Sequence, residues 1–77
     1  MKARIYVTLK KGVLDPQGKA IQHSLGSLGY ENINEVRVGK FFEIESREKI
    51  SEKQLKEMAE KLLSNTVIED YKIEINE

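Results

Sequence analysis

The segment ARIYVTLKKGVLDPQG, residues 3–18, sets the pattern of the fold. Its first seven residues alternate strictly between apolar and polar positions, which predicts a strand with one buried face. The apolar set is Ala3, Ile5, Val7 and Leu9, and the other face carries Arg4, Tyr6 and Thr8. Asp15 and Pro16 then stand as a helix N-cap and a first helical residue. The segment therefore predicts a strand followed by a helix.

This first helix is expected to end at Gly29, because glycine readily adopts the left-handed conformation that closes a helix. It is expected to bury Ala20, Ile21, Leu25 and Leu28. A second strand region follows from about Ile33 to Ser46, with Gly39 marking a bend or bulge. Its shared face carries Val36, Val38, Phe42 and Ile44. The pattern leaves open whether this region is one bent strand or a hairpin.

The stretch ISEKQL, residues 50–55, predicts a second helix, because Ser51 and Gln54 have the spacing of a capping box. Its expected apolar stripe is Leu55, Met58, Ala59, Leu62 and Leu63. Asn65 suits the left-handed position that closes the helix. A last strand is predicted with Val67, Tyr71, Ile73 and Ile75 on one face and Asp70, Lys72 and Glu74 on the other.

The predicted fold is α+β with the order β-α-β-α-β, in which two helices pack on an antiparallel sheet. If the middle region is a hairpin, the plan becomes ferredoxin-like. Seventy-seven residues are expected to form a single domain over residues 1–77. Because so short a chain buries a marginal core, self-association is expected, as a homodimer or a dimer of dimers.

Composition excludes several kinds of function. The absence of cysteine excludes disulfides, thiolate catalysis and cysteine-ligated metals. Thirteen basic and thirteen acidic residues balance, so the basic stripe typical of a nucleic-acid-binding protein is missing. No signal peptide or membrane-length apolar run is visible, which predicts no membrane association and a cytoplasmic location.

Glu69 and Asp70 are the one pair of neighbouring carboxylates that invites a catalytic interpretation. Successive strand residues point to opposite faces, so these two groups cannot converge on one substrate atom. His23, the single histidine, lies away from the apolar stripe of its helix and has no second histidine with which to share a metal. The glycines have no phosphate-binding spacing. We therefore expect no catalytic residue, no bound cofactor and no metal in this chain.

The stretch VGKFFEI, residues 38–44, resembles the base-stacking strand of RNA-recognition motifs. Such a site needs alternate aromatics on one open face, whereas Phe41 and Phe42 are adjacent and split between faces. Phe41 is then either a single exposed aromatic or, with Tyr6 and Arg37, part of a contact surface on the outer face of the sheet. Aromatics are favoured at such surfaces, and we expect contact.

Three segments of the chain are similar to the PurS family, the small subunits of formylglycinamidine ribonucleotide (FGAM) synthase. They are LKKGVLDPQG (residues 9–18), VRVGK (36–40) and EKLLSNTVIEDY (60–71). Residues within these segments that carry the match are Gly12, Asp15, Pro16, Gly39, Lys40, Asn65, Ile68, Asp70 and Tyr71. Thr66 stands where proline is common in the family, and Ala59 where cysteine is frequent.

The resemblance implies a non-catalytic subunit of an amidotransferase in purine biosynthesis. It implies two partners: PurL, an ATP- and magnesium-dependent synthetase, and PurQ, a glutaminase with a Cys–His site. The small subunit would bridge them and support ammonia transfer. The alternative is a stand-alone ferredoxin-like module that binds a ligand or RNA.

Overall fold

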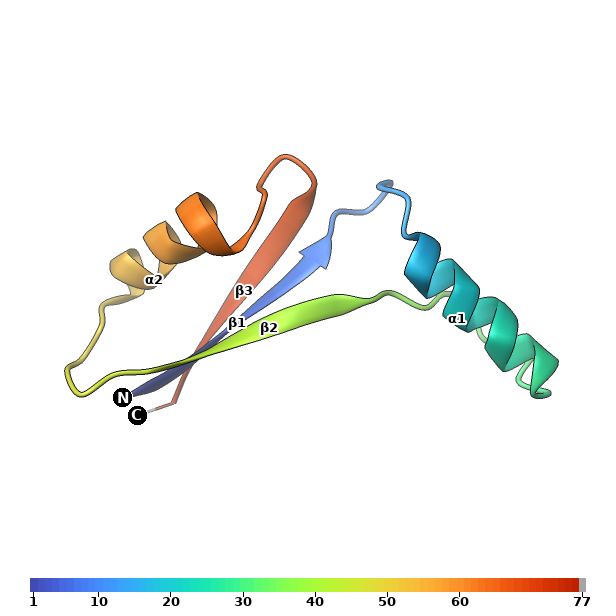
Figure 1. The fold of residues 1–77 in the computed structure, drawn as a ribbon, viewed down its shortest axis with the longest axis horizontal. Coiled ribbons are helices and arrows are strands. Elements are labelled where there is room, and N and C mark those ends of the chain that lie inside the picture. Colours follow the sequence, from blue (N-terminus) through green and yellow to red (C-terminus); the bar gives the residue numbers. More distant parts are fainter. Residues whose placement is uncertain (77) are drawn as a thin grey trace.

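The structure, a computed structural model, describes residues 1–76 as a three-stranded antiparallel sheet with two helical segments (Figure 1). The strand order in the sheet is β2-β1-β3, so the first strand is central. This confirms the predicted α+β class and the order β-α-β-α-β. The elements are β1 (Lys2–Leu9), α1 (Pro16–Ser27), β2 (Gly39–Glu45), α2 (Glu52–Met58), a π-helical turn η1 (Ala59–Leu63) and β3 (Glu69–Asn76).

The core lies on one face of the sheet, beneath α2 and η1. The strict alternation in β1 has the predicted consequence, since Ala3, Ile5 and Val7 are all buried. They pack with Leu55 and Ala59. The apolar residues of the two outer strands are only partly buried against this cluster. The fully buried core is therefore small, as the length of the chain leads one to expect.

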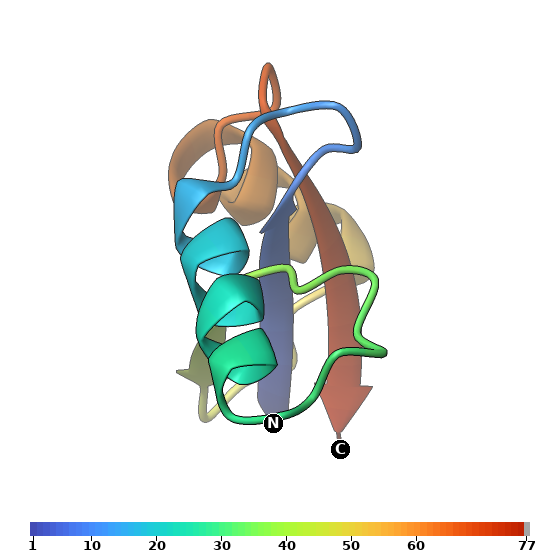
Figure 2. The same cartoon turned by 90° about the vertical axis from the view of Figure 1, so that its right-hand side faces the viewer.

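Helix α1 departs from the prediction, because it does not cover the sheet. It begins after Asp15 and closes at Gly29 as expected, with Gly29 at a φ of +102°. The N–H of Tyr30 donates to the carbonyl of Leu25, which completes a Schellman motif. However, the helix extends beyond the end of the sheet (Figure 1) and is the element nearest the viewer when the molecule is seen from that end (Figure 2). The expected burial is therefore wrong: Ile21 is 39% exposed and Leu28 74%.

The middle region is one strand that begins at Gly39, so residues 33–38 are not part of a strand and the hairpin alternative is wrong. Gly39 pairs with Thr8 at the end of the sheet and makes no bulge. A Cβ at Gly39 would lie 2.7 Å from both the Thr8 Cγ2 atom and the Val7 carbonyl oxygen. Glycine is required here because the two backbones approach so closely.

The second helix begins as predicted but ends differently. Both hydrogen bonds of the Ser51–Gln54 capping box are present. At Ala59 the α-helix widens into a π-turn, in which the Ser64 N–H donates to the Ala59 carbonyl five residues back. The wider turn shifts the helical phase. Leu63 therefore packs against the core, whereas Leu62 is 80% exposed, contrary to the predicted stripe.

The turn into β3 also differs from the prediction. Among the described residues no non-glycine has a positive φ, so Asn65 is not in the left-handed position. Its side-chain oxygen instead accepts a hydrogen bond from the Val67 N–H at 3.1 Å, which forms an Asx-turn. Val67 lies in this turn, 80% exposed, and is not part of the buried face of β3.

The helical phase yields a first prediction. Replacing Leu55, which is completely buried, with alanine should lower the free energy of unfolding by about 2–5 kcal/mol, because the change opens a cavity. The same replacement at Leu62 should change it by less than about 0.5 kcal/mol, because that side chain is exposed. Urea unfolding at matched protein concentration measures both. Equal losses for the two variants would contradict the described phase of the helix.

Candidate functional site

A buried carboxylate, Asp15, joins the start of α1 to the segment that enters β2. Its side chain is 7% exposed. One oxygen, Oδ1, accepts a hydrogen bond from the Gly18 N–H at 2.9 Å, which caps the helix. The other oxygen, Oδ2, accepts from the Val38 N–H at 3.0 Å. We name Asp15, Gly18, Arg37 and Val38 the Asp15 bracket.

Arg37 belongs to this bracket. Its Nη2 atom donates to the carbonyl oxygens of Leu9 at 2.9 Å and Lys10 at 3.1 Å, and its Nε lies 4.0 Å from the Oδ2 atom of Asp15. The prediction that placed Arg37 on the outer sheet face beside Phe41 is therefore wrong. Arg37 precedes β2, and its side chain is engaged by backbone carbonyls at the end of β1.

The bracket lowers the pKa of the Asp15 carboxyl below its usual value. The largest cause is the hydrogen bond from the Gly18 N–H, followed by the bond from the Val38 N–H. Desolvation opposes this lowering, and the positive charge of Arg37 adds to it. The folded protein thus favours the ionised form, which can accept both hydrogen bonds at once.

The second candidate site is the open face of the sheet, opposite α2. Tyr6 and Phe41 are cross-strand partners whose ring centroids lie 5.7 Å apart. The Arg4 guanidinium lies 5.5 Å from the centroid of Phe41, and its Nε is 3.2 Å from the carboxylate of Glu43. Phe41 remains 55% exposed. Two of the three predicted contact residues therefore lie together on this face.

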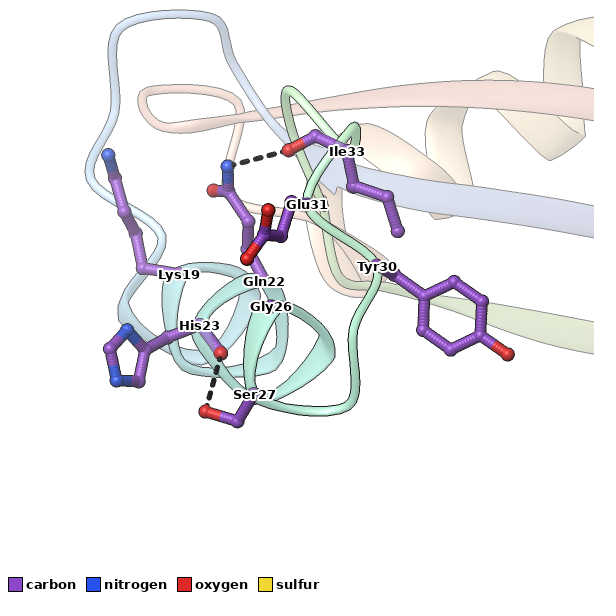
Figure 3. Close-up of a pocket in the computed structure, with 8 residues that line it drawn as sticks. All are labelled: Lys19, Gln22, His23, Gly26, Ser27, Tyr30, Glu31 and Ile33. Carbon is purple, nitrogen blue, oxygen red and sulfur yellow. Dashed lines mark hydrogen bonds between the residues drawn. The ribbon is translucent and has the colours of Figure 1, made fainter.

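A third feature is a shallow depression of about 560 Å³ between α1 and the segment that follows it (Figure 3). Gln22 crosses it and donates to the carbonyl oxygens of Ile33 at 3.1 Å and Asn34 at 3.0 Å. His23 is exposed, as predicted, and its ring extends from the helix into solvent (Figure 3). The polar contacts of the depression fasten the returning chain to α1.

The carboxylates of Glu69 and Asp70 do not form a shared site. Glu69 accepts a hydrogen bond from the Asn65 N–H at 2.7 Å, whereas the Asp70 carboxylate lies 3.9 Å from the Lys10 ammonium. Tyr71 donates its hydroxyl to the carboxylate of Glu60 at 2.8 Å, and this bond raises the pKa of Tyr71. These contacts fasten the turn and the strand.

Three further residues that carry the family resemblance, Gly12, Ile68 and Lys40, lie in a turn or contact other parts of the chain. Gly12 occupies a turn with a φ of +87°, and the Ile68 carbonyl accepts a hydrogen bond from the Lys10 N–H. The Lys40 ammonium lies 5.7 Å from the ring centroid of Phe42. Within residues 1–76 no group of three potential metal ligands comes together, and no helix is long and apolar enough to cross a membrane.

Comparison with known proteins decides the family. Residues 2–77 match the PurS family, described as phosphoribosylformylglycinamidine (FGAM) synthase. The PurS subunit of this synthase from Bacillus subtilis is 51% identical over 78 residues, spanning 99% of this chain and 93% of the relative. The chain belongs to the PurS family.

Solved structures agree with this assignment. A crystal form of B. subtilis PurS has a TM-score of 0.84 at 51% identity and covers 99% of this chain and 98% of that one. A chain in the structure of PurLQS from Thermotoga maritima has a TM-score of 0.80 at 30% identity, with 95% of this chain and 93% of that chain covered. The resemblance to PurS is thus confirmed, and nothing in these comparisons supports the alternative RNA- or ligand-binding module.

Sequence reasoning missed the bracket in this PurS-family chain. Asp15 was predicted as an N-cap only, and its second hydrogen bond, to Val38, spans a separation that no local motif encodes. A partial signal was the length of the connections at residues 10–15 and 28–38, the second of which is long for a segment that returns a helix to its own sheet.

The lowered pKa yields a second prediction. Below the usual pKa of an aspartate, about 3.9, the unfolded chain binds a proton that the folded bracket excludes. The stability contributed by ionised Asp15 should therefore be complete above that pH and be lost as the pH falls through the lower folded pKa. Chemical unfolding of the wild type and of Asp15→Asn from pH 7 to pH 2 should show their stability difference shrinking toward the acidic end.

Asp70→Asn is the matched control, because it removes an exposed carboxylate with one distant ion-pair partner. Its stability difference from the wild type should stay small at every pH. A difference for Asp15→Asn that stays constant between pH 7 and pH 2 would contradict the role given to the ionised carboxylate.

Proposed function

We propose that this chain is the small assembly subunit of FGAM synthase, a single PurS-like domain that joins the glutaminase PurQ to the synthetase PurL in the cytoplasm. The observation that carries the proposal is the match to the PurS family over residues 2–77. The similarity to a chain of PurLQS from T. maritima supports the choice of partners.

The proposed contribution of the chain is positional. In this assembly PurQ releases ammonia from glutamine, and PurL uses ATP and magnesium to activate the amide oxygen of formylglycinamide ribonucleotide. Ammonia released into water would be diluted and protonated, so the two active sites must be held in a fixed relation. The chain has no thiol with which to supply the glutaminase nucleophile.

We propose that the chain acts as a homodimer in which α1 of each copy is covered by the other copy. The helix presents Ile21, Leu25 and Leu28 on one side at spacings of four and three residues. Its only buried residue is Gly18. The same chain thus has an uncovered apolar helix and a sheet whose outer strands are only half covered. In a two-fold dimer, the helix of each copy can cover the apolar surface that the other copy leaves exposed.

We propose the open face around Tyr6 and Phe41 as a second contact surface, occupied by another dimer in a dimer of dimers. One ion pair lies within the face, because Arg4 contacts Glu43, and the Tyr6 hydroxyl lies 3.4 Å from the carboxylate of Glu74. Burial of Arg4 together with Glu43 would leave neither of these two charges unpaired, which limits their desolvation cost on association. The exposed ring of Phe41 supplies the apolar contact area.

The assembly role yields a third prediction. When PurL and PurQ from the same source are combined, FGAM should form from glutamine only if this chain is added. Ammonia at high concentration should support partial synthesis without PurQ, because PurL carries the ATP-dependent step. The measurement is product formation from glutamine and from ammonia with each subunit omitted in turn. Full glutamine-dependent synthesis without this chain would refute the proposed function.

The homodimer yields a fourth prediction. Leu28→Asp should raise the dissociation constant of the dimer at least about tenfold, because it places a charge where an apolar side chain is covered. The same change should barely affect the isolated fold, since Leu28 is 74% exposed within the chain. Sedimentation equilibrium over a range of protein concentrations measures the dissociation constant.

Two further variants distinguish the contact surface on α1 from the one on the open face of the sheet. His23→Asp introduces the same charge on the opposite side of α1 and should leave the dimer unchanged. Phe41→Glu should leave the dimer intact and prevent any larger assembly. If Leu28→Asp and His23→Asp behaved alike, α1 would not be the dimer surface.

A further inference from the structure

Helix α1 is held to the remainder of the chain at one place. Gly18, in its first turn, is its only buried residue, and the rest of the helix projects past the sheet (Figure 1). Midway along the helix, Gln22 fastens only the returning segment, which itself leads back to the bracket. The direction of the helix relative to the sheet is therefore decided by the contacts around Asp15.

Those contacts come from three segments that are distant in sequence. The carboxylate of Asp15 accepts hydrogen bonds from Gly18 in α1 and from Val38 before β2. Arg37, beside Val38, donates to the carbonyls of Leu9 and Lys10 at the end of β1. The start of the helix is thus linked through two side chains, Asp15 and Arg37, to the entry of β2 and the end of β1.

Close packing at Gly18 further restricts the position of the first turn of α1. A Cβ added at Gly18 would collide with the carbonyl oxygen of Val36 and would lie 2.6 Å from the Oδ2 atom of Asp15. The first turn of α1 therefore lies directly against the backbone of the returning segment. No side chain at residue 18 is compatible with this approach, so the helix cannot tilt toward that segment without breaking the bracket.

We propose that Asp15 is a positioning residue that fixes the direction of α1 and thereby commits the helix to a second copy of the chain instead of its own sheet. The connecting segments 10–15 and 28–38 are long enough to allow other directions. The two hydrogen bonds of one buried carboxylate select among them. This inference rests on the proposed self-association, and it adds that Asp15 sets the direction in which α1 meets the second copy.

Asp15→Asn is the sharpest variant. An asparagine remains a good N-cap, but its amide nitrogen cannot accept a hydrogen bond, so one of the two bonds of the bracket is lost. Gly18→Ala is a second variant, because its Cβ would force the first turn of the helix away from the returning segment while residue 15 keeps its carboxylate. Ser51→Ala is the control: it removes the N-cap of α2 and has no contact with the bracket.

The test uses the absence of native cysteine. Spin labels attached at His23→Cys on α1 and Lys53→Cys on α2, both exposed positions, report the direction of the helix as a distance distribution. Labelled chain is diluted into an excess of unlabelled chain of the same variant, so that only distances within one copy contribute. Sedimentation equilibrium of each variant without labels gives the dissociation constant of the dimer, and circular dichroism confirms folding.

The wild type and Ser51→Ala should give one narrow distribution. Asp15→Asn and Gly18→Ala should broaden or shift it, and both should raise the dissociation constant about tenfold, the size expected for losing a hydrogen bond to a charged group. Unchanged distributions in both bracket variants would overturn the positioning role. An altered distribution with an unchanged dissociation constant would overturn the link between direction and self-association.

The two proposals fail in different ways. If the wild type were monomeric at every concentration, the self-association in the proposed function would be refuted. The distance measurement would then still decide whether Asp15 sets the direction of α1.

Discussion

The two hydrogen bonds that Asp15 accepts are the constraint on which the arrangement of this chain depends. One bond caps α1 and the other holds the entry to β2, so a single ionised group sets where the helix starts and where the strand begins. A buried carboxylate is costly unless its oxygens are hydrogen-bonded, and here both oxygens are. Breaking either bond leaves part of that cost uncompensated. The first turn of α1 and the entry to β2 are therefore both held at hydrogen-bond distance from Asp15.

The direction of α1 has consequences for the rest of the fold. With the helix beyond the sheet, α2 and η1 alone cover the core within residues 1–76, and five hydrophobic residues of this part of the chain are buried. In our proposal a second copy completes this burial, and the open face around Phe41 remains for further assembly. In this proposal the other copies of the chain make each copy more rigid. Rigidity suits a subunit that is proposed to hold PurQ and PurL in a fixed relative position.

The sequence predicted the elements whose signals are local. The alternation from Ala3 to Leu9 predicted the half-buried strand β1, and the Ser51–Gln54 spacing predicted the start of α2. Family resemblance predicted the PurS assignment, which the comparisons confirmed.

The errors share a physical reason. Periodicity identifies which side of α1 is apolar, but not whether its own sheet or another molecule covers it. The π-turn at Ala59 moves Leu62 to the surface through a single extra residue in the helical turn, which no apolar pattern encodes. Arg37 was placed by extending a strand period past Gly39, where the strand in fact begins. Long-range hydrogen bonds and a change of helical period override local patterns at these positions.

The central claim, that the bracket directs α1 onto a second copy, is tested most directly by NMR on a mixed dimer. Chains labelled with ¹³C and chains at natural abundance are mixed, and isotope-filtered nuclear Overhauser effects then select contacts between copies. The account predicts intermolecular effects to the methyl groups of Ile21, Leu25 and Leu28. Effects from these methyl groups to the sheet of the same copy only, with none between copies, would contradict it.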